Sequence, residues 1–388
     1  MSNKCKIFKK GSKQSGITLV ALVVTVVILL ILAGISIRLV LDNNGIIKKS
    51  EEGKEKYGQA KENEQTDLDN ALDWIEDISG PSIVEPENID DWEYKTEDDG
   101  TLTITAYKGN ATELVIPNSI KGIRVKRIYG ADGRNMGYSG DKVSIWDNSI
   151  CSVAVGLGSN HTGAQNITKK IKISKGIEEI GDWALTGTVE LEDIEIPSSV
   201  KYIGVGAFWG CFKLKTNIKI PVEQDEIFPC TFMQCENLTN ITIPDSVTSI
   251  GNDAFNSCIS LTNITLPDSV TSIGDSAFHG CENLIEITIP DSVTSIDDYG
   301  FYGCKNLTEI TIPDSVIKIG QYTFRDCSNL TEITIPNSVT SMGKYAFDTG
   351  GKITVNVPFK KGKEPSGWNS DWNSPYLKKT TITVNYKE

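Results

Sequence analysis

Histidine is nearly absent from this chain, which has only His161 and His279 among 388 residues. This scarcity excludes zinc sites of the H-E-x-x-H type and weighs against a Ser-His-Asp hydrolase. Positive charge is also scarce, because 38 Lys and Arg face 51 Asp and Glu and leave a net charge of −13. A nucleic-acid groove needs excess positive charge, so we expect no nucleic-acid partner. No nucleophile and base stand out, and we predict a non-catalytic protein without cofactor or metal.

Acidic residues are missing from residues 1–16, which carry five lysines, and charge of either sign is missing from residues 17–37. As a helix at 1.5 Å per residue, this apolar run would be about 31 Å long, which matches a bilayer core. We therefore predict a single transmembrane helix over residues 17–41. The lysines place the amino terminus in the cytoplasm and the bulk of the chain outside the cell. A cleaved secretory signal is the alternative, because residues 33–36 (A-G-I-S) could form its cleavage site.

The start of the apolar run has a further feature, since Gly16 is followed by Ile17 and then T-L-V-A. This junction resembles the prepilin-type leader of type IV pilins and pseudopilins. The resemblance covers residues 9–41 and implies that a prepilin peptidase cuts between Gly16 and Ile17 and that Ile17 is then methylated. The family usually has Phe at the first mature position and Glu at the fifth, where this chain has Ile17 and Ala21. Because that Glu helps subunits dock, Ala21 argues against assembly as a major pilin.

Lysine and glutamate are interleaved between positions 48 and 64, within a segment that we predict to be an exposed charged helix over residues 42–80. The motif Ser79-Gly80-Pro81 would end that helix. We interpret the segment as a stalk that holds the outer domain away from the membrane. The alternative is a helix that packs into a pilus-like bundle.

Self-similarity dominates the rest of the chain. The phrase Ile/Leu-Pro-Asp/Asn-Ser-Val returns every 23 residues, with copies that begin at positions 243, 266, 289, 312 and 335. More divergent copies begin at positions 173, 196 and 220, a partial first copy at 116 and a last one at 357. One repeat cannot bury its own apolar face, but stacked repeats can, because equivalent positions line up as columns. The period therefore predicts a solenoid.

Each repeat has the spacing L-x-x-I-x-I, as at Leu238, Ile241 and Ile243. Strand side chains alternate, so we expect the two isoleucines to point inward and the residues beside them to point outward. Pro244 should end the strand, because proline cannot donate a ladder hydrogen bond. Residues 254–255 should close the coil as a short helical turn.

This pattern resembles the BspA-type leucine-rich repeat family of bacterial surfaces, over roughly residues 90–388 and most specifically in 196–347. The resemblance implies a solenoid of short parallel strands, turns and short helical segments that acts as a binding or adhesion module, with no catalytic motif. We expect a hairpin cap over residues 81–115 with its turn at residues 98–100. Repeats would follow over 116–357 with an insertion at 130–168. A carboxy-terminal cap over 358–388 would close with a hairpin at residues 381–384.

The nine cysteines first suggest disulfides, but their spacing favours another interpretation. One column repeats at intervals of 23 or 24 residues and comprises Cys211, Cys235, Cys258, Cys281, Cys304 and Cys327. We interpret these as small buried side chains in a corner of the coil. The sequence leaves Cys230 with Cys235 as the only plausible local disulfide pair. Cys151 lies in the insertion and Cys5 in the leader.

Two surfaces are candidates for ligand binding. The first is the open strand face, whose outward rows are Asn240, Asn263, Glu286, Glu309 and Glu332, and Thr242, Thr265, Thr288, Thr311 and Thr334. Repeat proteins often bind there, but threonine is also simply a good exposed strand residue. The second is the insertion, with Tyr138, Trp146 and His161, which could equally be a surface excursion with its own small apolar cluster.

These observations lead to one functional prediction. We expect a membrane-anchored, surface-displayed bacterial protein whose solenoid binds an extracellular protein or glycan. The alternative is a pilin-like or pseudopilin-like subunit with the solenoid as its head. Both histidines are expected to face solvent.

Overall fold

The structure is a computed structural model that describes residues 82–130, 167–376 and 379–387. The chain divides into two compact units, Met1–Pro81 and Ser82–Glu388, and every described residue belongs to the second. The predicted leader with Gly16 and Ile17, the transmembrane helix and the stalk lie outside the described residues. Within the described ranges, no helix has the length and apolar character needed to cross a bilayer.

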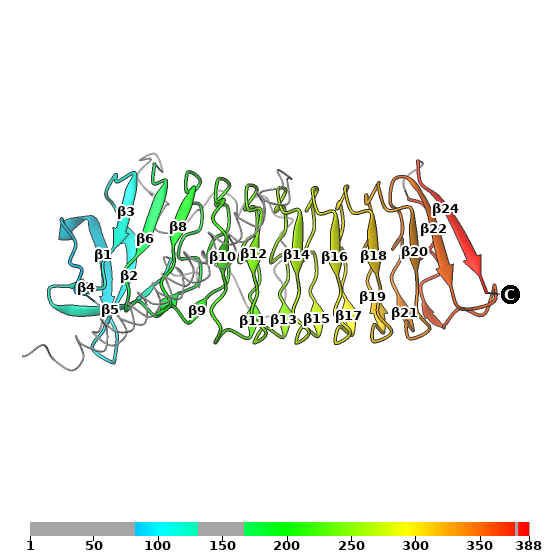
Figure 1. Ribbon diagram of the computed structural model, residues 1–388, viewed down its shortest axis with the longest axis horizontal. Helices are drawn as coiled ribbons and strands as arrows, with labels where there is room; N and C mark the ends of the chain where they lie inside the picture. Colours follow the sequence, from blue (N-terminus) through cyan, green and yellow to red (C-terminus); the bar gives the residue numbers. More distant parts are fainter. Residues whose placement is uncertain (1–81, 131–166, 377–378, 388) are drawn as a thin grey trace, which may run out of the picture. The chain divides into compact units, whose positions relative to one another are not determined.

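Short parallel strands stack into a solenoid (Figure 1), which confirms the predicted solenoid of short parallel strands. One row of strands, here called the face row, consists of β3 (Glu113–Ile116), β6 (Lys170–Ile173), β8 (Asp193–Glu195), β10 (Ile218–Lys219), β12 (Ile241–Thr242), β14 (Asn263–Thr265), β16 (Glu286–Thr288), β18 (Glu309–Thr311), β20 (Glu332–Thr334), β22 (Lys352–Val357) and β24 (Thr381–Tyr386). In the regular repeats a proline such as Pro244 lies one residue beyond the strand and helps to keep it short.

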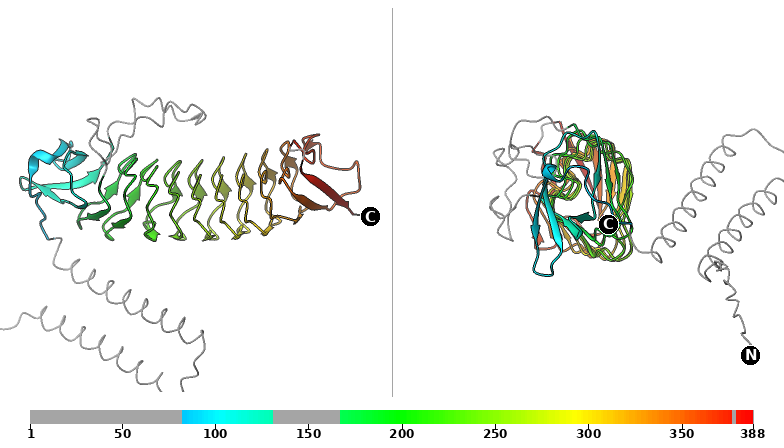
Figure 2. Two further views of the ribbon diagram at one scale, coloured as in Figure 1. Left: turned by 90° about the horizontal axis from the view of Figure 1, so that it is seen from above. Right: turned by 90° about the vertical axis from the view of Figure 1, so that its left-hand side faces the viewer.

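A second row of strands was not predicted from the sequence. It consists of β5 (Ile123–Ile128), β7 (Glu179–Ile180), β9 (Tyr202–Ile203), β11 (Glu226–Ile227), β13 (Ser249–Ile250), β15 (Ser272–Ile273), β17 (Ser295–Ile296), β19 (Lys318–Ile319), β21 (Ser341–Met342) and β23 (Gly367–Trp368). Strands from β11 to β23 form one continuous parallel sheet. Viewed along the solenoid, the coils superpose around a common core (Figure 2, right).

The third side of each coil corrects the prediction of short helical segments. Residues 252–257 form consecutive turns in which hydrogen bonds alternate in direction. The Asn256 N–H donates within the coil to the Asp253 carbonyl, whereas the Phe255 N–H donates to Ala277 in the next coil. Asp253 and Ser257 have φ angles of 56° and 61°, in the left-handed region. A helix cannot contain that alternation, because it needs right-handed φ at every residue.

The core is built from columns of equivalent side chains. Seven phenylalanines stack with ring centroids 5.4–5.8 Å apart and interplanar angles of 10° or less, namely Phe208, Phe232, Phe255, Phe278, Phe301, Phe324 and Phe347. Trp372 closes this column edge-on, 5.9 Å from Phe347. Each of the stacked phenylalanines is fully buried, so the column removes a large apolar surface from water in every coil.

The cysteine column has the predicted core role. All seven cysteines in the described ranges are buried and free, including Cys230 and Cys235, which form no disulfide. The Cys281 thiol donates to the Phe255 carbonyl of the preceding coil at 3.2 Å. Equivalent contacts of 3.1–3.3 Å recur at the other five members of the column. The thiol thus gives the buried corner a weak donor as well as a small apolar side chain.

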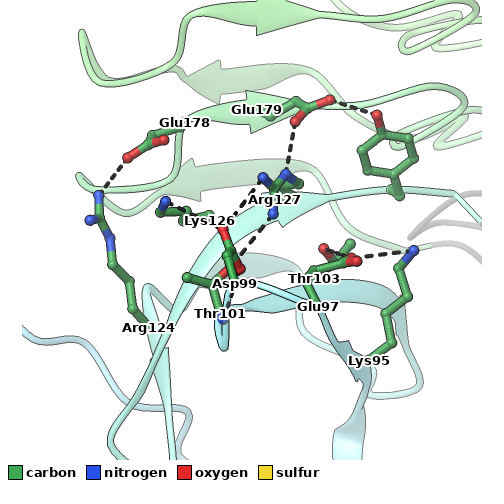
Figure 3. A network of polar contacts seen from close by, with 11 residues as sticks. Lys95, Glu97, Asp99, Thr101, Thr103, Arg124, Lys126, Arg127, Glu178 and Glu179 are labelled. Atoms are coloured by element: carbon green, nitrogen blue, oxygen red, sulfur yellow. Dashed lines mark hydrogen bonds and ion pairs between the residues drawn. The ribbon is translucent and has the colours of Figure 1, made fainter.

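At the amino-terminal end, β1 (Trp92–Thr96) and β2 (Leu102–Tyr107) form an antiparallel hairpin, and β2 then pairs in parallel with β5. The 3-10 helix η1 (Ile89–Asp91) precedes the hairpin, and β4 (Ser119–Ile120) pairs with β5. A polar network ties the hairpin turn to the next coil (Figure 3). Within it, Arg127 contacts Glu179 at 3.1 Å and Asp99 at 3.8 Å.

Asp99 lies at the centre of that turn. The Thr101 hydroxyl and N–H both donate to its carboxylate and hold its pKa at about 2. The Tyr129 hydroxyl donates to Glu179 at 2.6 Å, so Glu179 accepts from two side chains of the preceding coil. We therefore interpret the network as a structural tie between the cap and the repeats.

The carboxy-terminal end corrects a second prediction. Residues 381–384 lie in β24, which pairs in parallel with β22 and so does not form a closing hairpin. The intervening chain passes through β23, which continues the second row beside β21. This segment therefore makes one more coil, because a strand that returns after a full turn of a solenoid runs parallel to its predecessor.

Candidate functional site

The ten residues predicted on the strand face are all exposed, and the isoleucines between them are buried. Thr265, Thr288 and Thr311 lie in register on adjacent strands, as do Asn263, Glu286 and Glu309. The ladder is interrupted between β12 and β14 and again between β18 and β20. Near its end, Asn356 donates to Glu332 at 2.8 Å and to Thr334 at 3.3 Å. The face is a repetitive polar surface without aromatic residues at these ten positions.

The insertion residues Tyr138, Trp146 and His161 fall outside the described residues. The described chain ends at residue 130 before the insertion and resumes at residue 167. The coils on either side of it pair directly, since β3 lies in register with β6 and β5 with β7. The insertion therefore leaves the stacking of the two coils intact.

A surface that the sequence prediction missed lies along the turns between the second row and the cysteine column. We call it the turn edge, and its two columns contain the residues equivalent to Asp253 and Asn256 in each coil. At the amino-terminal end it is an apolar cluster in which Trp183 and Trp209 lie 5.6 Å apart, with Cys230 and Met233 packed beside them. Its central coils are polar. Unlike the strand face, the turn edge thus differs from coil to coil.

Towards the carboxy-terminal end, the turn edge becomes aromatic. We call this part the tyrosine edge, and it consists of Tyr299, Tyr302, Tyr322, Arg325, Tyr345 and Tyr376. Tyr322 stacks on Tyr299 at 5.1 Å and on Tyr345 at 5.4 Å. Tyr376 meets Tyr345 edge-on at 5.6 Å and is 62% exposed, while the other four tyrosines are half-buried.

Arg325 holds the cluster together. Its guanidinium lies 5.5 Å from the ring centroid of Tyr302, 5.3 Å from that of Tyr322 and 4.9 Å from that of Tyr376. The side chain is only 18% exposed, and its Nε lies 3.7 Å from the buried carboxylate of Asp348. Three aromatic rings and one buried anion thus fix the position of the cation, because cation–π attraction is strongest when the cation is desolvated.

The charge states follow from burial. Burial raises the pKa of Tyr299 and of Tyr302, so both keep their hydroxyl protons at neutral pH. The prediction that His279 faces solvent is wrong, because its imidazole is half-buried and stacks on Tyr302 at 4.6 Å. Burial lowers its pKa, which favours a neutral ring. The edge therefore offers aromatic rings and the protonated hydroxyls of Tyr299 and Tyr302 around the Arg325 guanidinium, and a second cation, Lys344, lies 5.6 Å from the Tyr322 ring centroid.

Such an arrangement has the residue types of a binding surface. Tyrosine and arginine are the residue types that most often carry binding energy at protein interfaces. Within the described ranges, no group of three or more His, Cys, Asp or Glu side chains is placed to hold a metal ion. Burial also raises the pKa of the column cysteines, to about 12 for Cys281, which makes them poor nucleophiles.

A sequence signal for the tyrosine edge existed. Tyr299, Tyr322 and Tyr345 are spaced by 23 residues, so the repeat alone places them in one column. Tyr376 could not be found in this way, because it comes from the irregular segment after β23.

Comparison with known proteins finds a matching repeat family and solved structures of similar architecture. The model of the BspA type leucine rich repeat region matches residues 162–262 and 248–362, in six copies. A leucine-rich repeat protein from Bacteroides ovatus has a similar structure, with a TM-score of 0.50 and 23% identity over 77% of this chain and 71% of that one. The T. pallidum leucine rich repeat protein shares 28% identity over 63% of this chain and 89% of that one, with a TM-score of 0.42. No curated protein matches the chain.

Proposed function

The chain belongs to the BspA-type leucine rich repeat family, and on that premise we propose that it is a non-catalytic, membrane-anchored protein of a bacterial surface that binds an extracellular protein or glycan. The place of this family on bacterial surfaces supports the location. The uncharged run at residues 17–37, behind five lysines, supports the anchor.

The tyrosine edge is the observation that carries the binding proposal. The strand face repeats the same polar residues from coil to coil, whereas a specific partner is recognised by a local and distinctive group. Arg325, packed against three aromatic rings, is such a group and is already ordered before any ligand arrives. Pre-ordering lowers the entropic cost of binding, which favours this edge as the contact surface.

Binding can be tested with the full-length protein held in detergent micelles. It would be presented to an array of extracellular-matrix proteins and glycans, and the strongest ligand would then be titrated against variants. We expect Arg325→Ala and Tyr376→Ala each to weaken binding at least tenfold. Thr311→Ala, on the strand face, is the matched control and should bind as the original protein does. Weaker binding by Thr311→Ala alone would indicate that the ligand binds the strand face. Absence of binding to every probe would contradict the proposal.

Processing at Gly16 is the second part of the proposal. Cleavage between Gly16 and Ile17 on the cytoplasmic side would leave the apolar run as the anchor of the mature protein. Mass spectrometry of protein purified from its native membrane should then show a methylated Ile17 as the first residue. A first residue at Met1, or one beyond residue 33, would contradict prepilin-type processing, and the latter would indicate a secretory signal.

The pilin-like alternative rests on the same junction. A subunit of a filament should be released when cells are sheared, whereas an anchored surface protein should stay with the membrane fraction. We expect the second outcome, because Ala21 stands where pilins usually carry a glutamate that helps subunits dock.

A further inference from the structure

The last strand of the face row, β24, pairs on only one side. Its register with β22 covers all six residues, from Lys352↔Thr381 to Val357↔Tyr386. Within the described residues no strand pairs with its other edge. Natural proteins usually protect such an edge with a proline, an inward charge or a bulge. The sequence of β24, T-I-T-V-N-Y, contains neither proline nor charge, and its register with β22 is regular throughout.

The inward side chains of β24 are less well covered than those of β22. In β22 the inward residues Ile353, Val355 and Val357 are at most 5% exposed. The residues in register with them on β24, Ile382, Val384 and Tyr386, pack against the same core but remain partly exposed. One further strand would cover them as β24 covers β22, so this edge offers both backbone hydrogen bonds and an apolar layer to a partner.

The direction of the free hydrogen-bonding groups follows from the ladder. The Thr381 N–H donates to the Gly351 carbonyl at 2.8 Å, which lies on the β22 side. In a parallel ladder alternate residues bond to the same neighbour, so the N–H groups of Thr383 and Asn385 also face β22. Those of Ile382, Val384 and Tyr386 therefore face the open edge.

Charge indicates what kind of strand fits. The chain as a whole is acidic, but the described residues from 352 onward carry six exposed lysines and two acids, Glu364 and Asp371. These lysines flank β24 at both ends and are Lys352, Lys360, Lys361, Lys363, Lys379 and Lys387, of which Lys379 already lies 3.8 Å from the Asp326 carboxylate. Two such basic ends would repel each other, which disfavours pairing of β24 with a second copy of itself. An acidic segment would be attracted instead.

We propose that β24 is a docking site for an extended, acidic protein segment with an apolar residue at every second position, which adds as a further parallel strand. Such a segment places its apolar side chains over Ile382 and Val384 and its acids near Lys361 and Lys387. Thr380, directly before β24, donates to Asp348, whose carboxylate lies beside Arg325, so the start of this strand is in contact with the tyrosine edge. The pairing proposed for β24 does not depend on the binding proposed at that edge.

A synthetic peptide with the sequence of residues 307–315 (L-T-E-I-T-I-P-D-S) is a suitable probe, because it is acidic and contains β18, which already forms a strand in this solenoid. Titration of full-length protein with the labelled peptide should give saturable binding that a scrambled peptide does not reproduce. Affinity should fall several-fold between 50 and 300 mM salt, as expected for attraction between exposed charges (a roughly twofold shorter screening length).

Two variants make the test specific. Val384→Pro removes an N–H that faces the open edge and should weaken peptide binding at least tenfold, whereas Val384→Thr keeps that N–H and should bind within threefold of the original. The double change Lys361→Glu and Lys387→Glu should also weaken binding and does not touch the ladder. If Val384→Pro bound the peptide as tightly as the original protein, backbone pairing would be overturned. Loss of peptide binding in both Val384→Pro and Val384→Thr would overturn it as well. A dimer in sedimentation that Val384→Pro abolishes would assign the edge to a second copy instead.

Discussion

At the scale of single residues, the corner cysteines show why one side chain recurs in six coils. The Phe255 carbonyl accepts the Cys258 N–H at 3.1 Å and the Cys281 thiol at 3.2 Å, so the sulfur fills a tight corner and also meets a carbonyl. A thiol buried in this way is poorly ionised, because burial raises the pKa of Cys281 to about 12.

We therefore predict that the seven cysteines of the described ranges do not react with Ellman's reagent at pH 8 while the protein is folded. Thiolate is the reactive form, and both burial and the raised pKa deplete it. The measurement uses a Cys5→Ser, Cys151→Ser background, so that only these seven thiols are counted. Guanidinium chloride should release all seven at once. Reaction of all seven thiols in buffer without denaturant would show that the buried cysteines become accessible without global unfolding.

Asp253 is a residue whose burial should be visible in the pH dependence of stability. Asp253 is 4% exposed, and burial raises the pKa of its carboxyl to about 7, even though the Asn256 amide donates to that carboxylate at 2.7 Å. The unfolded value is about 4. The folded state therefore binds this proton more tightly, and the free energy of unfolding should fall as pH rises from about 4 to about 7.

Asp253→Asn should remove this fall in the free energy of unfolding, because asparagine does not titrate. We expect the variant to gain up to about 4 kcal/mol relative to the original protein between pH 4 and pH 8, since each pKa unit corresponds to about 1.4 kcal/mol. Urea unfolding of both proteins at pH 4.5 and pH 8 measures the gain. If the difference in unfolding free energy between the two proteins were the same at both pH values, Asp253 would have the same pKa in the folded and unfolded chain.

At the scale of elements, the turns that close each coil depend on left-handed residues. Gly303 has a φ of 73°, and a Cβ built there would lie 3.6 Å from the Gly280 Cα, an ordinary contact. Gly303→Ala should thus cost about 1 kcal/mol from backbone strain, after a partial offset from the reduced freedom of the unfolded chain. The reciprocal change Ser257→Gly, at an equivalent position, should not destabilise by more than about 0.5 kcal/mol. Urea titrations that rank the two variants in the opposite order would contradict this account.

Some of these elements could be predicted from the sequence and others could not. The period of 23 and the alternation around Ile241 were sufficient for the face row and for the solenoid. The second row was missed because a two-residue strand such as Ser249–Ile250 is too short to show alternation. The prediction of helical segments was wrong because Ala254 and Phe255 were considered without the positions around them, although glycine at Gly280 and Gly303, equivalent to Ser257, favours a left-handed backbone. The tyrosine column was detectable from spacing, but its contact with Arg325 and Tyr376 depends on how the coils stack.

At the scale of the whole solenoid, each coil touches only its neighbours, so stability should be close to a sum over coils and interfaces. This separates two roles along the chain. Columns such as Phe278 and Cys281 are needed in every coil, whereas the turn edge is free to differ, from Trp183 and Trp209 at one end to Tyr322 at the other. Function can therefore be carried by a few coils while the others supply length.

Removal of one complete repeat tests this separation. Deletion of residues 243–265 joins Thr242 to Leu266, which are equivalent to consecutive positions, so the register of every later strand is kept. We expect a folded protein whose urea m-value falls by about a tenth, because m follows the surface exposed on unfolding and one of about ten coils is lost. Ligand binding at the tyrosine edge should be unchanged, since that edge begins at Tyr299. Deletion of residues 243–253 is the control, because it shifts inward side chains off their columns and should prevent folding. A full-repeat deletion that behaves like this control would show that the coils are not interchangeable.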